Sequence, residues 1–134
     1  MDGSVRFYDI RSGQFILDEI GEAIQSFCLA QSNRAYVASA VDNTMYLIER
    51  KSGNKVMEYT GHQAKNYTVN CKFTEEDSHV ISGATDGKLF IFDLMKSKPV
   101  GSISVSPKAL SGLDVHDHTL VVGSHDGNLY FSKY

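Results

Sequence analysis

Residues 61–93 read GHQAKNYTVNCKFTEEDSHVISGATDGKLFIFD, and this stretch carries the pattern that decides the fold. A Gly-His pair opens it, and three apolar runs follow: TVNCKF, HVISGA and LFIF. The turn Thr85-Asp86-Gly87 separates the last two runs. Asp-Gly is typical of a hairpin turn because glycine readily adopts the positive φ that the turn needs. The stretch therefore predicts short strands joined by tight turns.

The same landmarks recur along the whole chain. The turn pairs Asp2-Gly3, Asp42-Asn43, Asp86-Gly87 and Asp126-Gly127 are separated by 40, 44 and 40 residues. An apolar run follows each pair, at residues 4–9, 44–49, 88–93 and 128–133. A period of about 40 to 45 residues with four strands per unit is typical of a β-propeller built from WD repeats. We therefore predict an all-β chain of consecutive four-stranded blades.

The repeats divide the chain into four parts. We expect thirteen strands, distributed as two, four, four and three over residues 1–20 (the end of a blade), 21–60 (repeat one), 61–104 (repeat two) and 105–134 (an incomplete repeat three). Closed propellers have about four to eight blades, and an open end leaves strand edges and a blade face in water. We therefore expect a partial propeller of about three blades, either part of a longer chain or completed by association. The start inside a blade favours truncation, so a propeller fragment with no independent role is the alternative to a functional unit.

Composition narrows the function classes. The chain has 134 residues, 42% of them hydrophobic, and a net charge of -3, which provides no basic surface for binding a phosphate backbone directly. It contains neither a secretory signal pattern nor an apolar run of about 18 residues. Cys28 and Cys71 lie on the first strands of two successive repeats, where we expect reduced, buried thiols.

The residues that resemble catalytic or metal sites are better explained as structural residues of the strands and turns. His62 and Asp86 form the sharpest polar pair, and their positions before the first strand and in the second turn fit a role in blade stability. Gly83 to Lys88, GATDGK, is one residue short of a phosphate loop and is followed by leucine. Ser124, His125 and Asp126 are adjacent in a turn and do not form a triad.

A histidine and aspartate cluster near the end of the chain resembles a metal site on paper. Its members lie in turns at opposite ends of a strand, roughly 15 Å apart, whereas zinc ligands lie within about 2 Å of the ion. The cluster consists of His116, Asp117, His118, His125 and Asp126. We therefore predict no catalytic residue, no metal and no cofactor, and hence no enzyme.

One loop is a candidate for binding a partner. Lys65, Asn66 and Tyr67 lie together in a connection that is longer than a tight turn. A tyrosine beside a cation suits an interface anchor, and an ordinary surface loop is the alternative. Arg50-Lys51 and the segment Lys96-Ser97-Lys98 are interpreted as solvated charge in turns at the other end of the blades.

The segments DGSVRFYDIRSGQF (2–15), VDNTMYLIERKSGNKVMEYTGH (41–62) and YTVNCKFTEEDSHVISGATDGKLFIFDL (67–94) resemble the WD-repeat β-propeller family. Within it, the chain is similar to the C-terminal half of a seven-bladed scaffold type. That resemblance implies protein partners from a mitogen-activated protein kinase cascade, from the spliceosome in pre-mRNA splicing, or from both. It also implies a cytoplasmic and nuclear location, and the lack of a long apolar run predicts no membrane contact.

The chain departs from the family pattern because it has no tryptophan. The tryptophan position of the third strand is taken by Tyr8, Ile48, Phe92 and Ser132 in turn. The resemblance implies a buried polar network that links a histidine, a Ser or Thr, the turn aspartate and that tryptophan. In repeat two its members are His62, Ser82, Asp86 and Phe92, of which Phe92 supplies packing but no donor.

Overall fold

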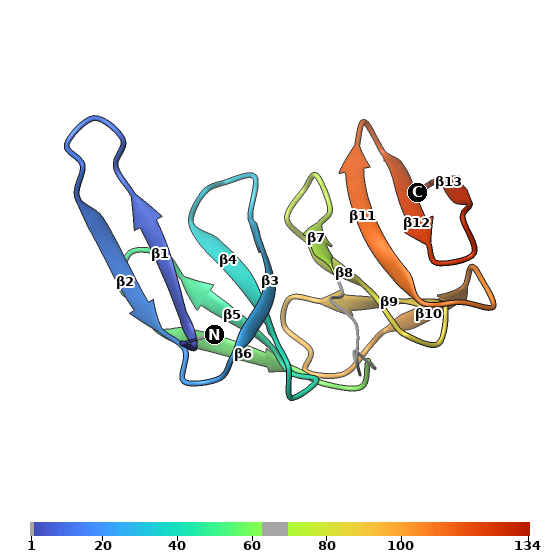
Figure 1. Cartoon of the computed structure of the whole chain (residues 1–134), viewed down its shortest axis with the longest axis horizontal. Helices are drawn as coiled ribbons and strands as arrows, with labels where there is room; N and C mark the ends of the chain where they lie inside the picture. Colours follow the sequence, from blue (N-terminus) through green and yellow to red (C-terminus); the bar gives the residue numbers. More distant parts are fainter. Residues whose placement is uncertain (1, 63–69) are drawn as a thin grey trace.

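The computed structural model describes residues 2–62 and 70–134. The described residues form thirteen β-strands in four antiparallel sheets and contain no helix. The sheets follow one another in sequence order along the long axis of the molecule (Figure 1). The all-β prediction is confirmed, and the distribution of strands over the sheets is the predicted two, four, four and three.

The first sheet pairs β1 (Ser4–Tyr8) with β2 (Phe15–Glu19). The second contains β3 (Ile24–Leu29), β4 (Ala35–Ala40), β5 (Met45–Glu49) and β6 (Lys55–Tyr59) in sequential order. The third contains β7 (Cys71–Phe73), β8 (His79–Gly83), β9 (Lys88–Asp93) and β10 (Gly101–Ser104). The fourth contains β11 (Leu110–His116), β12 (Thr119–Ser124) and β13 (Leu129–Lys133).

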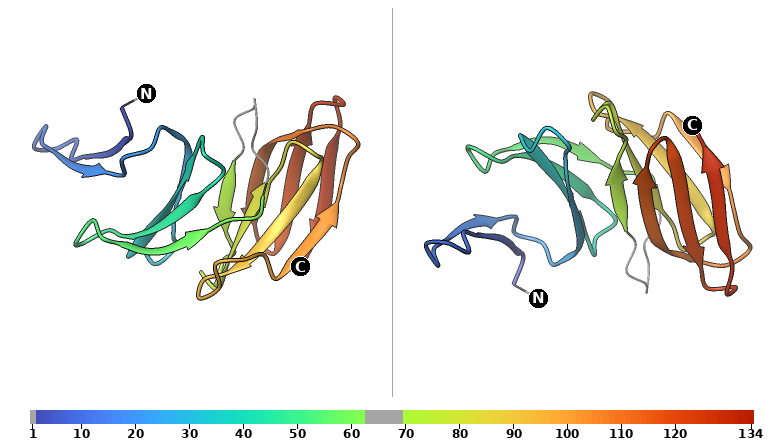
Figure 2. Two further views of the ribbon diagram at one scale, coloured as in Figure 1. Left: turned by 90° about the horizontal axis from the view of Figure 1, so that it is seen from below. Right: turned by 90° about the horizontal axis from the view of Figure 1, so that it is seen from above.

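The four sheets follow one another like consecutive propeller blades (Figure 2). Each pair of neighbouring sheets shares its own apolar cluster. β4 shows why a middle strand is apolar on both sides. Tyr36 and Ala38 face the cluster shared with the first sheet, while Val37 faces the cluster shared with the third. All three are completely buried, so this strand reads as an apolar run instead of an alternating one.

Two polar features complete these interfaces. The buried Tyr36 hydroxyl donates to the Asp18 carboxylate at 2.7 Å, which ties the second sheet to the first. Gly87 has a φ of +80°, and its carbonyl accepts from the amides of Val105 and Ser106 at 3.0 and 3.1 Å. This turn thereby joins the third sheet to the segment that leads into the fourth.

Among the described residues, no helix is long and apolar enough to cross a membrane.

Candidate interaction surface

Three turns from three successive sheets lie at the same end of the strands. The β3–β4, β7–β8 and β11–β12 hairpins all point to the upper side in Figure 1. The middle turn has the acidic sequence Glu75-Glu76-Asp77, and contacts join it to both neighbours. We refer to residues 30–34, 74–78 and 117–118 together as the turn surface.

Asp77 connects the turns of the second and third sheets. One of its carboxylate oxygens accepts from the Gln31 amide at 2.7 Å, and the other accepts from the Ser32 amide at 2.8 Å. Its backbone is left-handed, with φ 54°, a conformation that aspartate tolerates better than most residues. Charged acceptors form short, strong hydrogen bonds, so this carboxylate holds the two turns in a defined relation.

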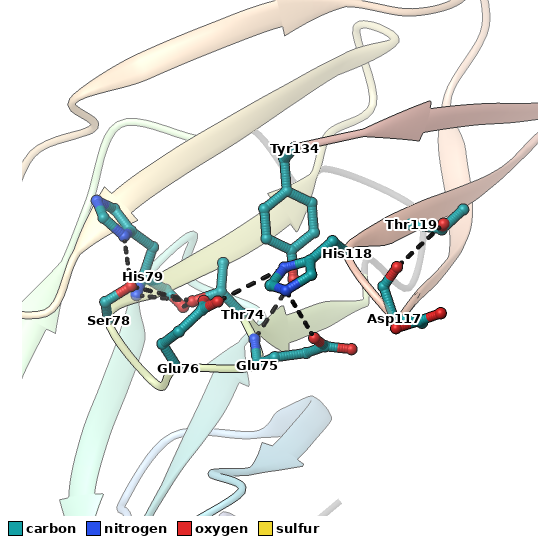
Figure 3. Close-up of polar contacts among 9 residues, drawn as sticks. All are labelled: Thr74, Glu75, Glu76, Ser78, His79, Asp117, His118, Thr119 and Tyr134. Atoms are coloured by element: carbon teal, nitrogen blue, oxygen red, sulfur yellow. Dashed lines mark hydrogen bonds and ion pairs between the residues drawn. The ribbon is translucent and has the colours of Figure 1, made fainter.

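His118 connects the turns of the third and fourth sheets. Its Nε2 atom lies 3.6 Å from Glu75 Oε2, and its Nδ1 atom lies 3.5 Å from Glu76 Oε1 (Figure 3). Both ring nitrogens thus face a carboxylate, and these contacts become ion pairs when the imidazole is protonated. All three side chains are partly exposed to solvent, which limits the contribution of these two contacts to stability.

Tyr134 packs beside His118 and also contacts the turn of the third sheet. The Tyr134 amide donates to the His118 carbonyl at 3.1 Å, and the two rings meet edge to face at 5.6 Å. The Tyr134 hydroxyl also accepts from the Glu75 amide at 3.4 Å (Figure 3). One aromatic side chain therefore contacts both turns that the imidazole connects.

Hydrogen bonds inside the middle turn hold its shape. The Thr74 hydroxyl accepts from the His79 amide at 3.1 Å, and the Ser78 hydroxyl lies 2.9 Å from His79 Nδ1. Below the turn, Lys72 Nζ lies 3.1 Å from the Asp114 carboxylate of the fourth sheet and keeps the pKa of Asp114 below its usual value. Polar contacts therefore join the turns of all three sheets in the turn surface.

Of the residues predicted for the polar network, His62, Ser82 and Phe92 are buried and Asp86 is exposed. The His62 ring is 3% exposed and meets Phe92 edge to face at 6.0 Å, and neither ring nitrogen has a hydrogen-bond partner among the described residues. The Ser82 hydroxyl donates to the Gly83 carbonyl at 3.0 Å, and Asp86 accepts from the Lys88 amide at 3.1 Å. A network through all four residues stays a prediction.

Burial changes the acid-base behaviour of His62. Loss of solvent lowers the pKa of this imidazole to about 4, although the Asp42 carboxylate acts in the opposite direction. His62 is therefore neutral at neutral pH, which suits a packed structural residue.

The predicted loop residues Lys65, Asn66 and Tyr67 lie outside the described residues.

The residues that resemble a metal site and a catalytic triad in the sequence lie at both ends of β12 in the fourth sheet. His116, Asp117 and His118 lie at one end of β12, and His125 and Asp126 follow its other end. Across residues 2–62 and 70–134, no group of three or more His, Cys, Asp or Glu side chains is arranged to hold a metal ion. The segment Gly83 to Lys88 forms the end of β8, the hairpin turn and the start of β9.

A set of turn contacts was missed by the sequence analysis. The Tyr130 hydroxyl donates to Asp126 Oδ2 at 2.6 Å, and the Ser106 hydroxyl donates to the same oxygen at 3.0 Å. Equivalent contacts join Tyr46 to Asp42 and Arg6 to Asp2. The signal was present, because a side chain with a donor stands four residues after each of these aspartates.

Comparisons with known proteins agree with this geometry. The family model "WD domain, G-beta repeat" matches residues 53–93. The chain is 33% identical to rat "WD repeat domain-containing protein 83" over 116 residues, which is 87% of this chain and 37% of that protein. It is 33% identical to the human protein of the same name over 81% of this chain and 35% of that protein.

A more distant relative covers nearly the whole chain. The fission yeast "Uncharacterized WD repeat-containing protein C713.05" is 26% identical over 99% of this chain and 46% of its own length. The chain therefore spans between about a third and a half of the length of these curated relatives.

Proposed function

We propose that this chain, a WD-repeat protein by its matched repeat and by its relatives, is a non-catalytic scaffold for protein–protein interaction. WD-repeat proteins generally act in this way and generally lack catalytic activity. The observation that carries the proposal for this chain is the turn surface, where side chains from three successive sheets are held by contacts between the sheets. Contacts that hold side chains in place before binding lower the entropic cost of binding a partner.

The finer proposal concerns the partners. The resemblance of residues 2–94 to a kinase-cascade scaffold favours components of a mitogen-activated protein kinase cascade, spliceosome components, or both. Under this proposal the protein acts in the cytoplasm and the nucleus. The net charge of -3 favours protein partners over direct contact with nucleic acid.

The turn surface offers a matched pair of charge reversals for the test. Glu76 is exposed in the middle turn, whereas Glu58 is exposed on the outer strand β6. The full chain and its Glu76→Lys and Glu58→Lys variants are immobilised, and capture of a purified kinase cascade and of purified spliceosome components is measured. We expect Glu76→Lys to lower capture of the true partner at least tenfold, and Glu58→Lys to leave it unchanged, at equal Tm. Equal loss in both variants, or capture of neither set by the unmodified chain, overturns the proposal.

The loop hypothesis has its own test. Lys65, Asn66 and Tyr67 remain a proposed second contact, on the basis of their residue types alone. Tyr67→Ala is expected to reduce capture of the same partners, and unaltered capture removes the loop from the proposal.

A further inference from the structure

Two buried thiols from neighbouring sheets touch each other. Cys28 Sγ on β3 lies 3.5 Å from Cys71 Sγ on β7, although the two residues are 43 positions apart in the chain. Both cysteines are free. A disulfide has an S–S length of about 2.05 Å, so the sulfurs need to approach by roughly 1.5 Å, a distance within the range of side-chain rotation.

The environment of the pair excludes the usual roles of a cysteine cluster. The two residues are 6% and 1% exposed and belong to the apolar cluster between the second and third sheets. The contact with Cys71 and the burial together raise the pKa of the Cys28 thiol well above its usual value. The raised pKa keeps the thiolate a minor form at neutral pH, which disfavours metal binding and makes any reaction of the pair a slow one that proceeds through the thiolate fraction.

A cavity nevertheless borders one of the two cysteines. A cavity of about 300 Å³ is lined by Cys28, with Phe27, Leu29 and Lys72 among its other walls. The Lys72 ammonium acts on the Cys28 thiol in favour of the thiolate, against the larger effects of burial and of Cys71. A small oxidant in this cavity therefore lies next to Cys28, whose sulfur is 3.5 Å from that of Cys71.

We propose that Cys28 and Cys71 form a redox-sensitive pair, which a peroxide converts into a disulfide between the second and third sheets. In the first step Cys28 loses its proton, the thiolate attacks one peroxide oxygen, the O–O bond breaks, and the hydroxide that leaves takes up a proton, so that a sulfenic acid and one water form. In the second step the Cys71 sulfur attacks the Cys28 sulfur, the S–O bond breaks, and the disulfide and a second water form. Two thiols and one hydrogen peroxide thus give one disulfide and two waters, and a dithiol reverses the change.

The position of the bond determines its effect. It joins the first strands of two adjacent sheets across the interface that they bury, and it closes a segment of the chain that contains most of the second sheet. A cross-link of this kind restricts the unfolded chain and opposes separation of the sheets. Oxidation therefore stabilises this interface, without any contribution from the turn surface.

The test uses the reduced full chain treated with hydrogen peroxide or with diamide. We expect thiol titration in denaturant to fall from two to zero, the intact mass to fall by two hydrogen atoms, and a peptide containing Cys28 linked to Cys71 to appear after digestion. The Tm is expected to rise and to return after dithiothreitol. Diamide serves as the second oxidant because peroxide also adds oxygen to methionine.

The variants Cys28→Ala and Cys71→Ala separate a specific pair from general oxidation. Each is expected to keep one thiol, to form no monomeric disulfide and to show no oxidant-dependent rise in Tm. Two free thiols after treatment of the folded chain, or products joined only between chains, overturn the proposal. The mass and peptide measurements on the unmodified chain decide the question even if a variant does not fold.

Discussion

The Tyr130 hydroxyl donates a 2.6 Å hydrogen bond to Asp126, across the hairpin turn that joins β12 and β13. The same geometry links Tyr46 to Asp42 in the second sheet, with a longer distance of 3.3 Å. In the third sheet the corresponding aspartate is Asp86, and the residue four positions later is Phe90, which has no donor. The turn aspartate and the side chain of the next strand thus form a repeated stabilising pair that is incomplete in the third sheet.

Tyr130→Phe tests the contribution of this pair. The change removes the donor and keeps the ring, so we expect the free energy of unfolding to fall, by an amount that solvent exposure of Asp126 keeps small. Chemical denaturation of both proteins measures the difference. Phe90→Tyr is the matched gain of a donor opposite Asp86, and it is expected to stabilise the chain or leave it unchanged. A larger loss in Phe90→Tyr than in Tyr130→Phe contradicts the interpretation.

Acid should affect the Asp126 contact in a defined direction. The hydrogen bond from Tyr130, together with the Asn128 amide and the Ser106 hydroxyl, keeps the pKa of Asp126 below its usual value near 3.8. A carboxylate with a lowered pKa contributes stability above that usual value and loses it as the pH falls through the folded value. We expect Tm to fall more steeply below about pH 4 in the unmodified chain than in Asp126→Asn. Parallel curves for the two proteins would contradict this, and high salt should weaken the difference.

The lowered pKa of His62 predicts that stability also changes in a second pH range, which lies above that of Asp126. Its pKa falls from 6.5 to about 4 because the ring is buried, so the unfolded chain takes up a proton between these values and the folded chain does not. Stability is therefore complete above about pH 6.5 and declines as the pH falls toward about 4. His62→Phe is expected to remove this decline, as measured by Tm between pH 4 and 7. At pH 7 a lower Tm in this variant supports the predicted polar network, and an unchanged Tm argues against it.

Gly87 and Gly127 separate two reasons for glycine in a turn. Both have positive φ, of 80° and 87°, but a Cβ on Gly87 would lie 1.8 Å from the Ser106 carbonyl, whereas nothing lies within 4 Å of one on Gly127. Gly127→Ala is therefore expected to lower the free energy of unfolding only by the cost of the left-handed backbone, about 1 to 2 kcal/mol. Gly87→Ala adds a clash with backbone and should cost more than that range. Equal losses in denaturation of the two variants would show that the approach of Ser106 is not maintained.

The sequence alone predicted how the strands group into sheets, but it did not predict the contacts between the sheets. The period of the turn pairs predicted how the strands group, because Asp-Gly turns depend on local backbone conformation. The contacts of His118 with Glu75 and Glu76 join different sheets, and no pattern in one sequence reports that proximity. The Asp126 and Tyr130 pair could have been predicted from the sequence, because a donor side chain recurs four residues after the turn aspartate.

Asp77 is the clearest test of the turn surface as a built structure. Its carboxylate accepts from the amides of Gln31 and Ser32, and its own φ is 54°. Asp77→Ala loses both acceptors and strains the backbone, so we expect a loss of about 1 to 3 kcal/mol in the free energy of unfolding. Asp77→Gly relieves the backbone and still loses the acceptors, which isolates the carboxylate.

Asp77→Gly also tests whether the Asp77 carboxylate matters for partner binding. If the carboxylate positions the β3–β4 turn, Asp77→Gly should increase hydrogen exchange at the Gln31 and Ser32 amides, because both lose their acceptor. Partner capture through the turn surface should weaken in parallel, since a mobile turn costs more to order on binding. Unchanged exchange at both amides would show that the two sheets hold their turns independently, and the turn surface would then lose its basis as a single binding site.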